Sequence, residues 1–369
     1  MTILITGGAG FIGSHVADAL IARGKPVRIL DNLSEQVHGP QGRFPVYLNP
    51  SAELVRGDIR DRHAVAAALD GVRAVIHLAA AVGVGQSMYE MERYMSVNSL
   101  GTAILLEELI KRPPSKLIVA SSMSIYGEGL YRSNGNGRQP VSSRRSENLR
   151  AGIWDLLDEA GGPLLPLPTP EEKTPHLSSI YALSKYDQER MCLMAGAAYG
   201  FPAIALRFFN TYGPRQALSN PYTGVLAIFA ARLLNDKPPL IFEDGNQRRD
   251  FISVYDVARA CCLALESDLR NAVLNIGSGK AWTVRQVAEQ LAALLGKPDI
   301  RPVIAGQYRA GDIRHCFADI GRARSQLGFQ PAVGLAEGLA DLCTWLSDQQ
   351  AEDHVDRAYA ELSERGLTL

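Results

Sequence analysis

Three side chains of the sequence have the types and spacing needed to move a proton: Tyr181, Lys185 and Ser122. Tyr181 and Lys185 are four residues apart in a segment of helical pattern, so their side chains share one helix face. A phenol with a pKa of about 10 is a poor base at neutral pH, but a neighbouring ammonium group favours the phenolate. Ser122 follows a predicted buried strand, where its hydroxyl can bridge a bound oxygen and the phenol. A Tyr and a Lys at this spacing also occur by chance in many helices.

A glycine-rich turn near the N-terminus is typical of a dinucleotide site. Gly7, Gly10 and Gly13 stand between a predicted strand and a predicted helix. There they permit a tight turn, close approach of a pyrophosphate and close packing of the helix. Asp31 ends the next predicted strand, where its carboxylate can bind an adenosine ribose and would repel a 2′-phosphate. The pattern favours NAD over NADP; the alternative is an ordinary strand-to-helix turn with Asp31 as a helix cap.

Two further segments can meet such a cofactor. Asp58 and Ile59 follow the third predicted strand, where they can face the adenine amino group and ring. A plain turn aspartate explains Asp58 nearly as well. The segment His77 to Ala81 ends the fourth strand with small residues, which would let the cofactor lie close to the backbone. Tight packing alone explains this segment equally well.

A parallel sheet is the element that would position these segments. Short β-branched runs alternate with helical segments through the first half of the chain, as in βαβ units. We therefore predict an α/β fold, with a Rossmann-type doubly wound parallel sheet and a smaller mixed α/β substrate-binding lobe. The predicted strands are 2–6, 27–30, 53–55, 74–77, 116–120 and 203–207, and the predicted helices are 11–23, 60–69, 94–111 and 178–199.

The pattern also suggests how the chain is divided into domains. Residues 129–175 are rich in Gly and Pro and lack periodicity, so they are predicted to form an inserted surface loop. A polar amphipathic stretch, 352–365, predicts a terminal helix. We assign 1–207, with the insertion, to an NAD-binding domain to which 251–276 returns, and 208–250 and 277–369 to the substrate lobe.

Composition excludes several functional classes. The 38 Lys and Arg residues against 39 Asp and Glu give a net charge of −1, which supplies no general field for nucleic acid or an anionic membrane. The most apolar stretch, 74–85, is too short for the roughly 20 residues that span a bilayer. Five cysteines without metal-type spacing argue against a disulfide framework and favour a reducing cytoplasm. No signal peptide and no metal site are expected.

In this order the motifs resemble those of the extended short-chain dehydrogenase/reductase family, specifically its NAD-dependent nucleotide-sugar epimerases and dehydratases. The resemblance covers residue 2 to about residue 349 and implies that Ser122, Tyr181 and Lys185 are catalytic. It implies an NAD site formed by Gly7, Gly10, Phe11, Ile12, Gly13, Asp31, Asn32, Asp58, Ile59, Leu78, Ala79, Ala80, Asn98, Tyr181 and Lys185, in which Asn98 orders a helix. It implies that Ser122, Ser124, Asn210, Arg215, Arg249, Arg309 and Asp312 bind a nucleotide-diphosphate sugar. Without the resemblance, each of these arginines would be taken as a solvated surface charge.

Similarity to the 4-epimerases implies inversion at C4 of a UDP or dTDP hexose or deoxyhexose through a transient 4-keto sugar. Dehydratases of the family carry Asp-Glu after the catalytic hydroxyl, whereas this chain has Met123 and Ser124, which disfavour 4,6-dehydration. Oxidative decarboxylation of a nucleotide-bound uronic acid would use the same Ser, Tyr and Lys and is the alternative reaction. A protein that binds NAD without turnover is a third hypothesis, which the intact catalytic residues disfavour.

Two departures bear on the substrate. Val82 stands where many galactose-type 4-epimerases place a Lys, and the 129–175 insertion resembles that of epimerases acting on deoxythymidine-diphosphate deoxysugars, such as rhamnose 4-epimerases. The insertion could cover and select the sugar, or it could be a surface elaboration or dimer contact. The resemblance implies a homodimer through the helices 94–111 and 178–199, although core packing explains the same amphipathic faces.

Overall fold

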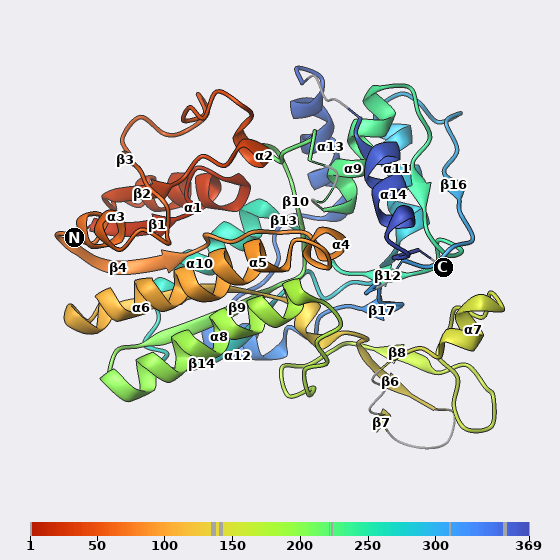
Figure 1. Cartoon of the computed structure of the whole chain (residues 1–369), viewed down its shortest axis with the longest axis horizontal. Coiled ribbons are helices and arrows are strands. Elements are labelled where there is room, and N and C mark those ends of the chain that lie inside the picture. Colours follow the sequence, from red (N-terminus) through yellow and green to blue (C-terminus); the bar gives the residue numbers. More distant parts are fainter. Residues whose placement is uncertain are drawn as a thin grey trace.

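A seven-stranded parallel sheet forms the centre of the protein in the computed structural model, which describes residues 2–133, 138–139, 143–220, 222, 224–309, 311–349 and 353–368. Its strand order is β14-β9-β5-β4-β1-β2-β3 (Figure 1). The strands are β1 (Thr2–Thr6), β2 (Val27–Asp31), β3 (Glu53–Arg56), β4 (Val72–His77), β5 (Lys116–Ser122), β9 (Ala203–Phe208) and β14 (Ala272–Ile276). The six predicted strands are confirmed, and β14 adds a seventh at the edge beside β9.

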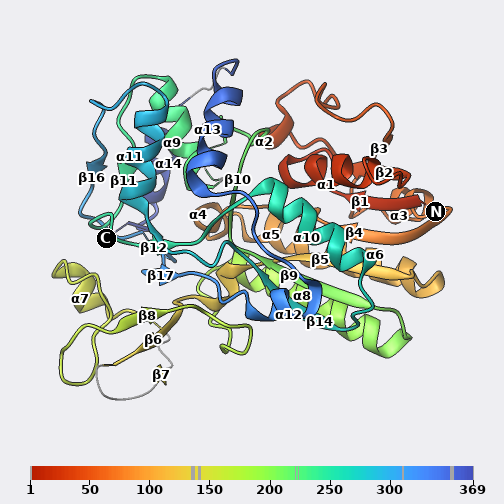
Figure 2. The same cartoon turned by 180° about the vertical axis from the view of Figure 1, so that it is seen from behind.

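Helices cover both faces of this sheet because its buried strands are apolar on both sides. Along β1, Ile3 and Ile5 point to one layer of helices and Leu4 points to the other. The first layer is α1 (Phe11–Ile21), α10 (Val254–Glu266) and α12 (Gly321–Leu327). The second is α3 (Arg62–Ala68), α6 (Gly101–Lys111) and α8 (Ile180–Tyr199). Figure 2 shows α10 and α12 in front of the sheet, and Figure 1 shows α6 and α8 there. The predicted doubly wound α/β fold is confirmed.

The helix predicted over 94–111 is interrupted by a π-helical segment. The structure has α5 (Met91–Tyr94), then a π-helix at Met95–Leu100, then α6. Asn98 lies within the π segment and is completely buried. Its side-chain amide accepts a hydrogen bond from Ala81 N at 2.7 Å and donates to Ala81 O at 3.0 Å. Such π turns are often found at functional sites, and this one fixes the backbone of the segment after β4.

The remaining elements build a smaller lobe and its connections. Helices α9 (Val225–Leu234), α11 (Val284–Leu294) and α13 (Leu335–Leu346) share a separate apolar core with Tyr212 and Phe251. The other helical segments are α2 (Glu35–His38), α4 (Val84–Ser87), a 3₁₀ turn (Met123–Tyr126) and the terminal helix α14 (Val355–Glu364). The short strands are β10 (Asn210–Tyr212), β11 (Leu240–Ile241), β12 (Arg248–Arg249), β13 (Phe251–Ser253), β15 (Trp282–Thr283), β16 (Val303–Ile304) and β17 (His315–Cys316). The terminal helix predicted over 352–365 is confirmed as α14; residue 352 lies outside the described residues.

The insertion at 129–175 differs from the irregular surface loop that the sequence predicts. It contains β6 (Leu130–Arg132), β7 (Arg138–Gln139) and β8 (Leu165–Leu167), which form their own antiparallel sheet, and helix α7 (Ser146–Arg150). Tyr131, Leu156 and Leu164 bury one another in a small separate core. Short strands amid many Gly and Pro residues leave little periodicity, which is why the sequence gives no sign of them. Figure 1 shows the insertion beside β12 and β17, away from the large sheet.

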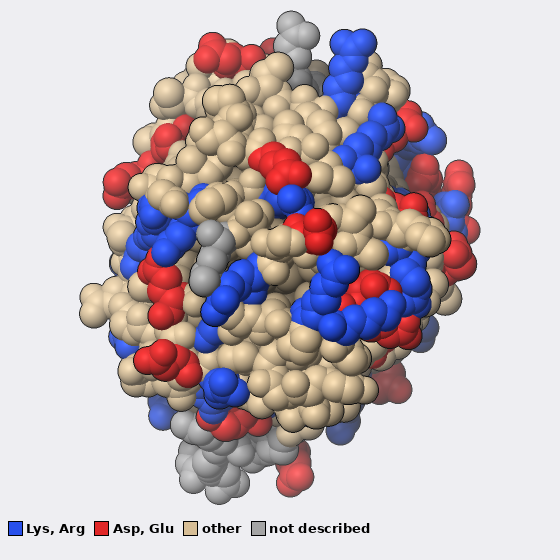
Figure 3. Space-filling model, turned by 90° about the vertical axis from the view of Figure 1, so that its left-hand side faces the viewer, with Lys and Arg blue, Asp and Glu red and all other residues tan. Residues whose placement is uncertain are grey.

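The molecular surface carries charges of both signs. On the face in Figure 3, Lys and Arg side chains lie among Asp and Glu side chains. Within the described ranges, we find no helix that is both long enough and apolar enough to span a membrane. The same residues hold no group of three or more His, Cys, Asp or Glu side chains that could bind a metal ion.

Candidate active site

A cavity of about 950 Å³ lies between the carboxyl ends of the sheet strands and the smaller lobe. This is the edge where doubly wound sheets bind ligands. Most predicted site residues line it: Gly7, Gly10, Phe11, Ile12, Gly13, Asp31, Asn32, Ile59, Leu78, Ala79, Ala80, Ser122, Ser124, Tyr181, Lys185, Asn210, Arg249, Arg309 and Asp312. The predicted residues that do not line it are Asp58, Asn98 and Arg215. Segments far apart in the sequence therefore meet at one cavity, as predicted.

The glycine-rich turn has the geometry of a dinucleotide cradle. Gly7 has a φ of +70°, and a Cβ on it would lie 2.8 Å from the backbone N and Cα of Ala79. A Cβ on Gly13 would lie 2.5 Å from the carbonyl oxygen of Gly7. Any side chain at either position would separate the turn from its neighbours. The backbone is therefore exposed to the cavity, as a pyrophosphate requires.

Asp31 is fixed at the end of β2 beside this turn. Its Oδ2 accepts a hydrogen bond from Ala9 N at 3.0 Å, and its Oδ1 accepts one from Leu33 N at 2.9 Å. A carboxylate held in this way faces the cavity with a defined orientation. A ribose diol can hydrogen-bond to it, whereas a ribose 2′-phosphate would be repelled. The turn and Asp31 together fit NAD.

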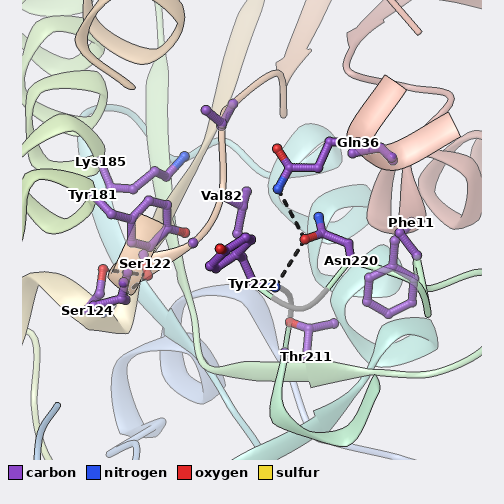
Figure 4. A pocket seen from close by; sticks show the side chains of 18 of the residues that line it. Phe11, Gln36, Val82, Ser122, Ser124, Tyr181, Lys185, Thr211, Asn220 and Tyr222 are labelled. Carbon is purple, nitrogen blue, oxygen red and sulfur yellow. Dashed lines mark hydrogen bonds between the residues drawn. The ribbon is translucent and has the colours of Figure 1, made fainter. Parts of the chain in front are cut away.

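Ser122 and Tyr181 form the centre of the site (Figure 4). Ser122 ends β5, and its Oγ accepts a hydrogen bond from Ser124 Oγ at 2.9 Å. Burial raises the pKa of Tyr181, and a hydrogen bond with Ser122 acts in the opposite direction. Ser87 Oγ accepts a hydrogen bond from the backbone N of Tyr181 at 3.0 Å, which fixes the first turn of α8. The phenol and the serine hydroxyl therefore meet in the arrangement expected for proton transfer.

Lys185 is the third member of the group and lies one turn after Tyr181 on α8. Burial lowers its pKa to about 8, although Cys192 and Glu189 act in the opposite direction. Lys185 lines the same cavity as Tyr181. It donates a hydrogen bond to Gln188 Oε1 at 2.5 Å. Sequence reasoning missed Gln188, although its position three residues after Lys185 on the same helix is a signal.

Gln188 connects Lys185 to a buried polar network under the site. Its amide nitrogen donates to Ala79 O at 3.2 Å and to Thr102 Oγ1 at 2.9 Å. His77 Nε2 lies 2.9 Å from Thr102 Oγ1, and His77 Nδ1 lies 2.7 Å from Thr6 Oγ1. Burial lowers the pKa of His77 to about 3, with Lys185 acting in the same direction. The imidazole is therefore neutral and serves to orient its neighbours.

This buried histidine predicts an acid-dependent loss of stability. An unfolded histidine has a pKa of about 6.5, so between about pH 6.5 and pH 3 the unfolded chain binds one more proton at this position. The free energy of unfolding should therefore fall with decreasing pH, by up to about 1.4 kcal/mol per pH unit from this group. His77→Asn should reduce that slope, as measured by urea titrations of the variant and the wild type at a series of pH values. Equal slopes in the wild type and in His77→Asn would show that His77 is not the source of the acid-dependent loss of stability.

Three of the predicted site residues lie outside the cavity lining. Asp58 does not line the cavity because its carboxylate accepts hydrogen bonds from Arg60 N, Nε and NH2 and from Asn32 Nδ2. Arg215 does not line it because its guanidinium pairs with Asp18 at 2.7 Å and lies over the Tyr47 ring. Asn98 acts from behind the cavity, where it holds the backbone of Ala81.

The smaller lobe contributes polar side chains to the far end of the cavity. Arg309 pairs with Asp312 at 2.8 Å, which holds its guanidinium at the cavity wall. Arg249 donates to the backbone oxygens of Ile313 and Arg314. Asn210 Oδ1 is buried and has no hydrogen-bond partner among the described residues. Buried polar atoms usually have partners, so this one is consistent with a polar ligand at this end.

The expectation that the insertion covers the sugar is not supported: none of its described residues lines the cavity. It acts instead through Arg144, whose side chain is only 3% exposed. This guanidinium pairs with Glu243 at 2.7 Å and Glu128 at 3.1 Å and donates to Asp312 O at 3.1 Å. The insertion therefore holds the segment that carries Arg309 and Asp312.

Arg144→Met should weaken substrate binding more than it slows the chemical step. The change would remove the guanidinium that pairs with two buried carboxylates. The free energy of unfolding should fall by about 3–5 kcal/mol. The substitution would also release the Asp312 segment, so the KM for a substrate bound at this end of the cavity should rise several-fold with little change in kcat. Arg145→Met, at the neighbouring exposed position, is the matched control. An unchanged KM in folded Arg144→Met would refute this role.

The structure also places unpredicted residues in the cavity. Gln36 donates to Asn220 Oδ1 at 3.1 Å, and Tyr222 N donates to the same oxygen at 3.0 Å (Figure 4). Tyr222 and the terminal helix α14 also line the cavity. The contact between Gln36 and Asn220 joins residues 184 positions apart, so local sequence patterns could not indicate it.

Comparison with known proteins identifies the family. The model of the NAD dependent epimerase/dehydratase family matches residues 3–146 and 159–277. The chain belongs to this family. The resemblance seen in the sequence is therefore confirmed, and the NAD-dependence of the family agrees with the cradle around Gly7 and Asp31.

Relatives within the family are named as 4-epimerases. The dTDP-L-rhamnose 4-epimerase of Burkholderia thailandensis is 36% identical, over 94% of this chain and 95% of that protein. A putative UDP-glucose 4-epimerase of Methanocaldococcus jannaschii is 34% identical, over 94% and 98%. The structure of a UDP-glucose 4-epimerase of Thermotoga maritima with UDP-glucose has a TM-score of 0.76 and 34% identity, over 94% of this chain and 99% of that one. A Thermus thermophilus UDP-glucose 4-epimerase in complex with NAD has a TM-score of 0.73 and 32% identity, over 94% and 99%.

Proposed function

We propose that the protein is an NAD-dependent isomerase that inverts C4 of a nucleotide-diphosphate sugar through a transient 4-keto intermediate. The observation that carries the proposal is that Ser122, Tyr181 and Lys185 line the same cavity as the glycine-rich turn and Asp31, which fit NAD. The named relatives support C4 inversion within this family. The UDP and dTDP hexoses and deoxyhexoses are the substrate class.

Each catalytic side chain has a distinct role in this proposal. Tyr181 removes the proton from the C4 hydroxyl as phenolate and returns it after inversion. Ser122 holds the C4 oxygen beside the phenol, and Lys185 lowers the cost of the phenolate charge. Bound NAD supplies the hydride acceptor and donor. Because the hydrogen that leaves C4 returns to C4, the reaction needs no net oxidant.

The adenosine half of the cofactor and the nucleotide half of the substrate would occupy opposite ends of the cavity, and the reacting sugar would lie between them beside Tyr181. Gly7, Gly10, Gly13 and Asp31 would hold the NAD pyrophosphate and ribose, and Asn210, Arg249 and Arg309 would hold the sugar nucleotide. Fixed guanidinium groups suit diphosphate oxygens because they donate in a planar fork. For the division into lobes we keep the proposal of 1–207 and 251–276 for the cofactor and 208–250 and 277–369 for the substrate. Within the last range, α12 (Gly321–Leu327) packs on the large sheet.

Two other activities are compatible with parts of the site. A UDP-N-acetyl-alpha-D-glucosaminuronate decarboxylase of Bacillus cytotoxicus is 28% identical, so oxidative decarboxylation of a uronic acid is the second candidate reaction. A dTDP-glucose 4,6-dehydratase of an Actinoplanes strain is 27% identical. Dehydration is disfavoured because Met123 and Ser124 line the cavity where an acid and a base would be needed.

Product analysis distinguishes these reactions. The purified protein would be incubated with a panel of UDP- and dTDP-sugars, including uronic acids, and the products resolved by NMR. We expect a mixture of two C4 epimers from at least one sugar. Release of carbon dioxide would identify the decarboxylase, and NAD binding without any turnover would indicate a non-catalytic protein.

The oligomeric state and the cellular location of the protein remain predictions. A homodimer through α6 and α8 is supported by the large apolar side chains Leu100, Met194 and Tyr199, each more than half exposed on or beside these helices. Sedimentation equilibrium would distinguish a dimer from a monomer. A cytoplasmic protein without nucleic-acid or membrane partners is what the composition predicts.

A further inference from the structure

Helix α14 reaches the cavity although it lies at the far end of the chain. Four of its side chains line the cavity: Val355, Ala358, Tyr359 and Leu362. Ala358 and Leu362 are 7% and 4% exposed, so this face of the helix packs against the rest of the protein. Figures 1 and 2 both show α14 beside α9 and α11 of the smaller lobe.

Polar contacts fix α14 against both parts of the protein. Asp356 pairs with Arg232 of α9 at 2.5 Å. Glu361 Oε2 accepts hydrogen bonds from Tyr222 at 2.9 Å and from Tyr89 at 3.3 Å. Tyr89 precedes α5 in the sheet domain, and Tyr222 precedes α9 in the smaller lobe. The helix therefore bridges the two sides of the cavity and has one defined position.

Leu362 lies beside α4, the short helix next to the start of α8. Its two methyl carbons lie 3.3 and 3.6 Å from the position of a Cβ on Gly85. Gly85 belongs to α4, whose Ser87 accepts the hydrogen bond from the backbone of Tyr181. One short helix thus separates Leu362 from the backbone of the catalytic tyrosine. By contrast, Tyr359 packs on Phe242 at 6.0 Å between ring centroids, farther along the smaller lobe.

The wall that contains Leu362 is apolar. Val82 and Val84 line the cavity in the same segment as Gly85, and Val82 is 49% exposed despite its apolar side chain. Figure 4 shows Val82 beside Tyr181 and Tyr222. Among the cavity-lining cations, Lys185 hydrogen-bonds to Gln188, Arg309 pairs with Asp312, and Arg93 pairs with Glu90. Arg60 pairs with Asp58, and Arg249 donates to two backbone oxygens. A carboxylate or hydroxyl on the sugar would lose water at this wall without gaining a partner.

We propose that Leu362 contacts the sugar and, with Val82, selects nucleotide sugars with an apolar substituent at C5. The preferred substrates would be 6-deoxyhexoses, whose C6 is a methyl group, over hexoses and uronic acids. This inference rests on the proposed epimerase function. An apolar pocket rejects an added hydroxyl only moderately, so we expect a preference of about 10- to 100-fold in kcat/KM.

A matched substrate pair tests the selection. We would measure kcat/KM for dTDP-6-deoxyglucose and dTDP-glucose, which differ only by the C6 hydroxyl, in wild type and in Leu362→Gln. A polar side chain should reduce the preference for the deoxysugar about tenfold or more. Leu362→Met and Glu364→Ala, the latter at an exposed position of α14, should keep it.

A second variant tests the same selection if Leu362→Gln does not fold. Val82→Thr places a hydroxyl at a partly exposed position of the same wall with almost unchanged shape, and it should also lower the preference. An unchanged ratio in every folded variant, or a wild type that prefers dTDP-glucose, would overturn the selection while leaving the epimerase proposal intact. A wild type that turns over neither sugar nor any member of the wider panel would instead refute the proposed function.

Discussion

Tyr181→Phe should lower kcat by about 10²- to 10⁴-fold, the range that general acid–base groups contribute. The variant keeps the ring, which packs edge-on against Tyr94 at 6.4 Å between centroids, and loses only the hydroxyl near Ser122. The dissociation constant for NAD should therefore change by less than about twofold. Steady-state turnover and fluorescence titration with NAD measure the two effects separately.

Tyr186→Phe is the matched control for that experiment. Tyr186 lies on the same helix, packs against a separate cluster with Ile125 and Phe209, and does not line the cavity. Loss of the Tyr186 hydroxyl should leave kcat unchanged. Turnover at the wild-type rate in Tyr181→Phe would refute the proton-transfer role.

Gly13→Ala should weaken NAD binding by about tenfold or more. The added methyl would lie 2.5 Å from Gly7 O and 2.6 Å from Gly8 Cα, both backbone atoms that cannot rotate away. Such overpacking costs about 1–3 kcal/mol, and each 1.4 kcal/mol is about a factor of ten in affinity. We expect the displaced turn to lose its fit to the pyrophosphate, which isothermal titration with NAD would detect.

Gly334→Ala provides the comparison for this variant. Gly334 stands at the start of α13, and a Cβ there has no atom within 4 Å. It should bind NAD like the wild type and have nearly the same melting temperature. Equal NAD affinity in Gly13→Ala and Gly334→Ala would show that the turn is not part of the cofactor site.

Local patterns predicted the parts of the site that single segments carry. The glycine turn follows from the strand-to-helix transition, Asp31 from a strand end, and the Tyr181–Lys185 pair from helical spacing. The parallel sheet places these segments close together, because the carboxyl ends of all its strands lie at one edge of the sheet. Sequence reasoning is reliable where the position of a residue follows from its own element.

The sequence did not indicate those features that depend on contacts between distant segments. Arg215 has a φ of +69°, pairs with Asp18 and does not line the cavity. The insertion forms a sheet of its own and acts through Arg144 on Asp312, which no local pattern shows. Leu362 reaches the cavity only because α14 packs across the lobes. Each of these depends on contacts between segments that are far apart in the chain.

The fate of the hydrogen at C4 shows whether the sugar is oxidised and reduced at this carbon. The reaction would be run to equilibrium in D₂O with a nucleotide sugar that the protein turns over, and the products followed by NMR. The account predicts inversion at C4 with the original hydrogen retained there, because only the hydroxyl proton exchanges through Tyr181. Deuterium bound to C4, or inversion at another carbon, would contradict it.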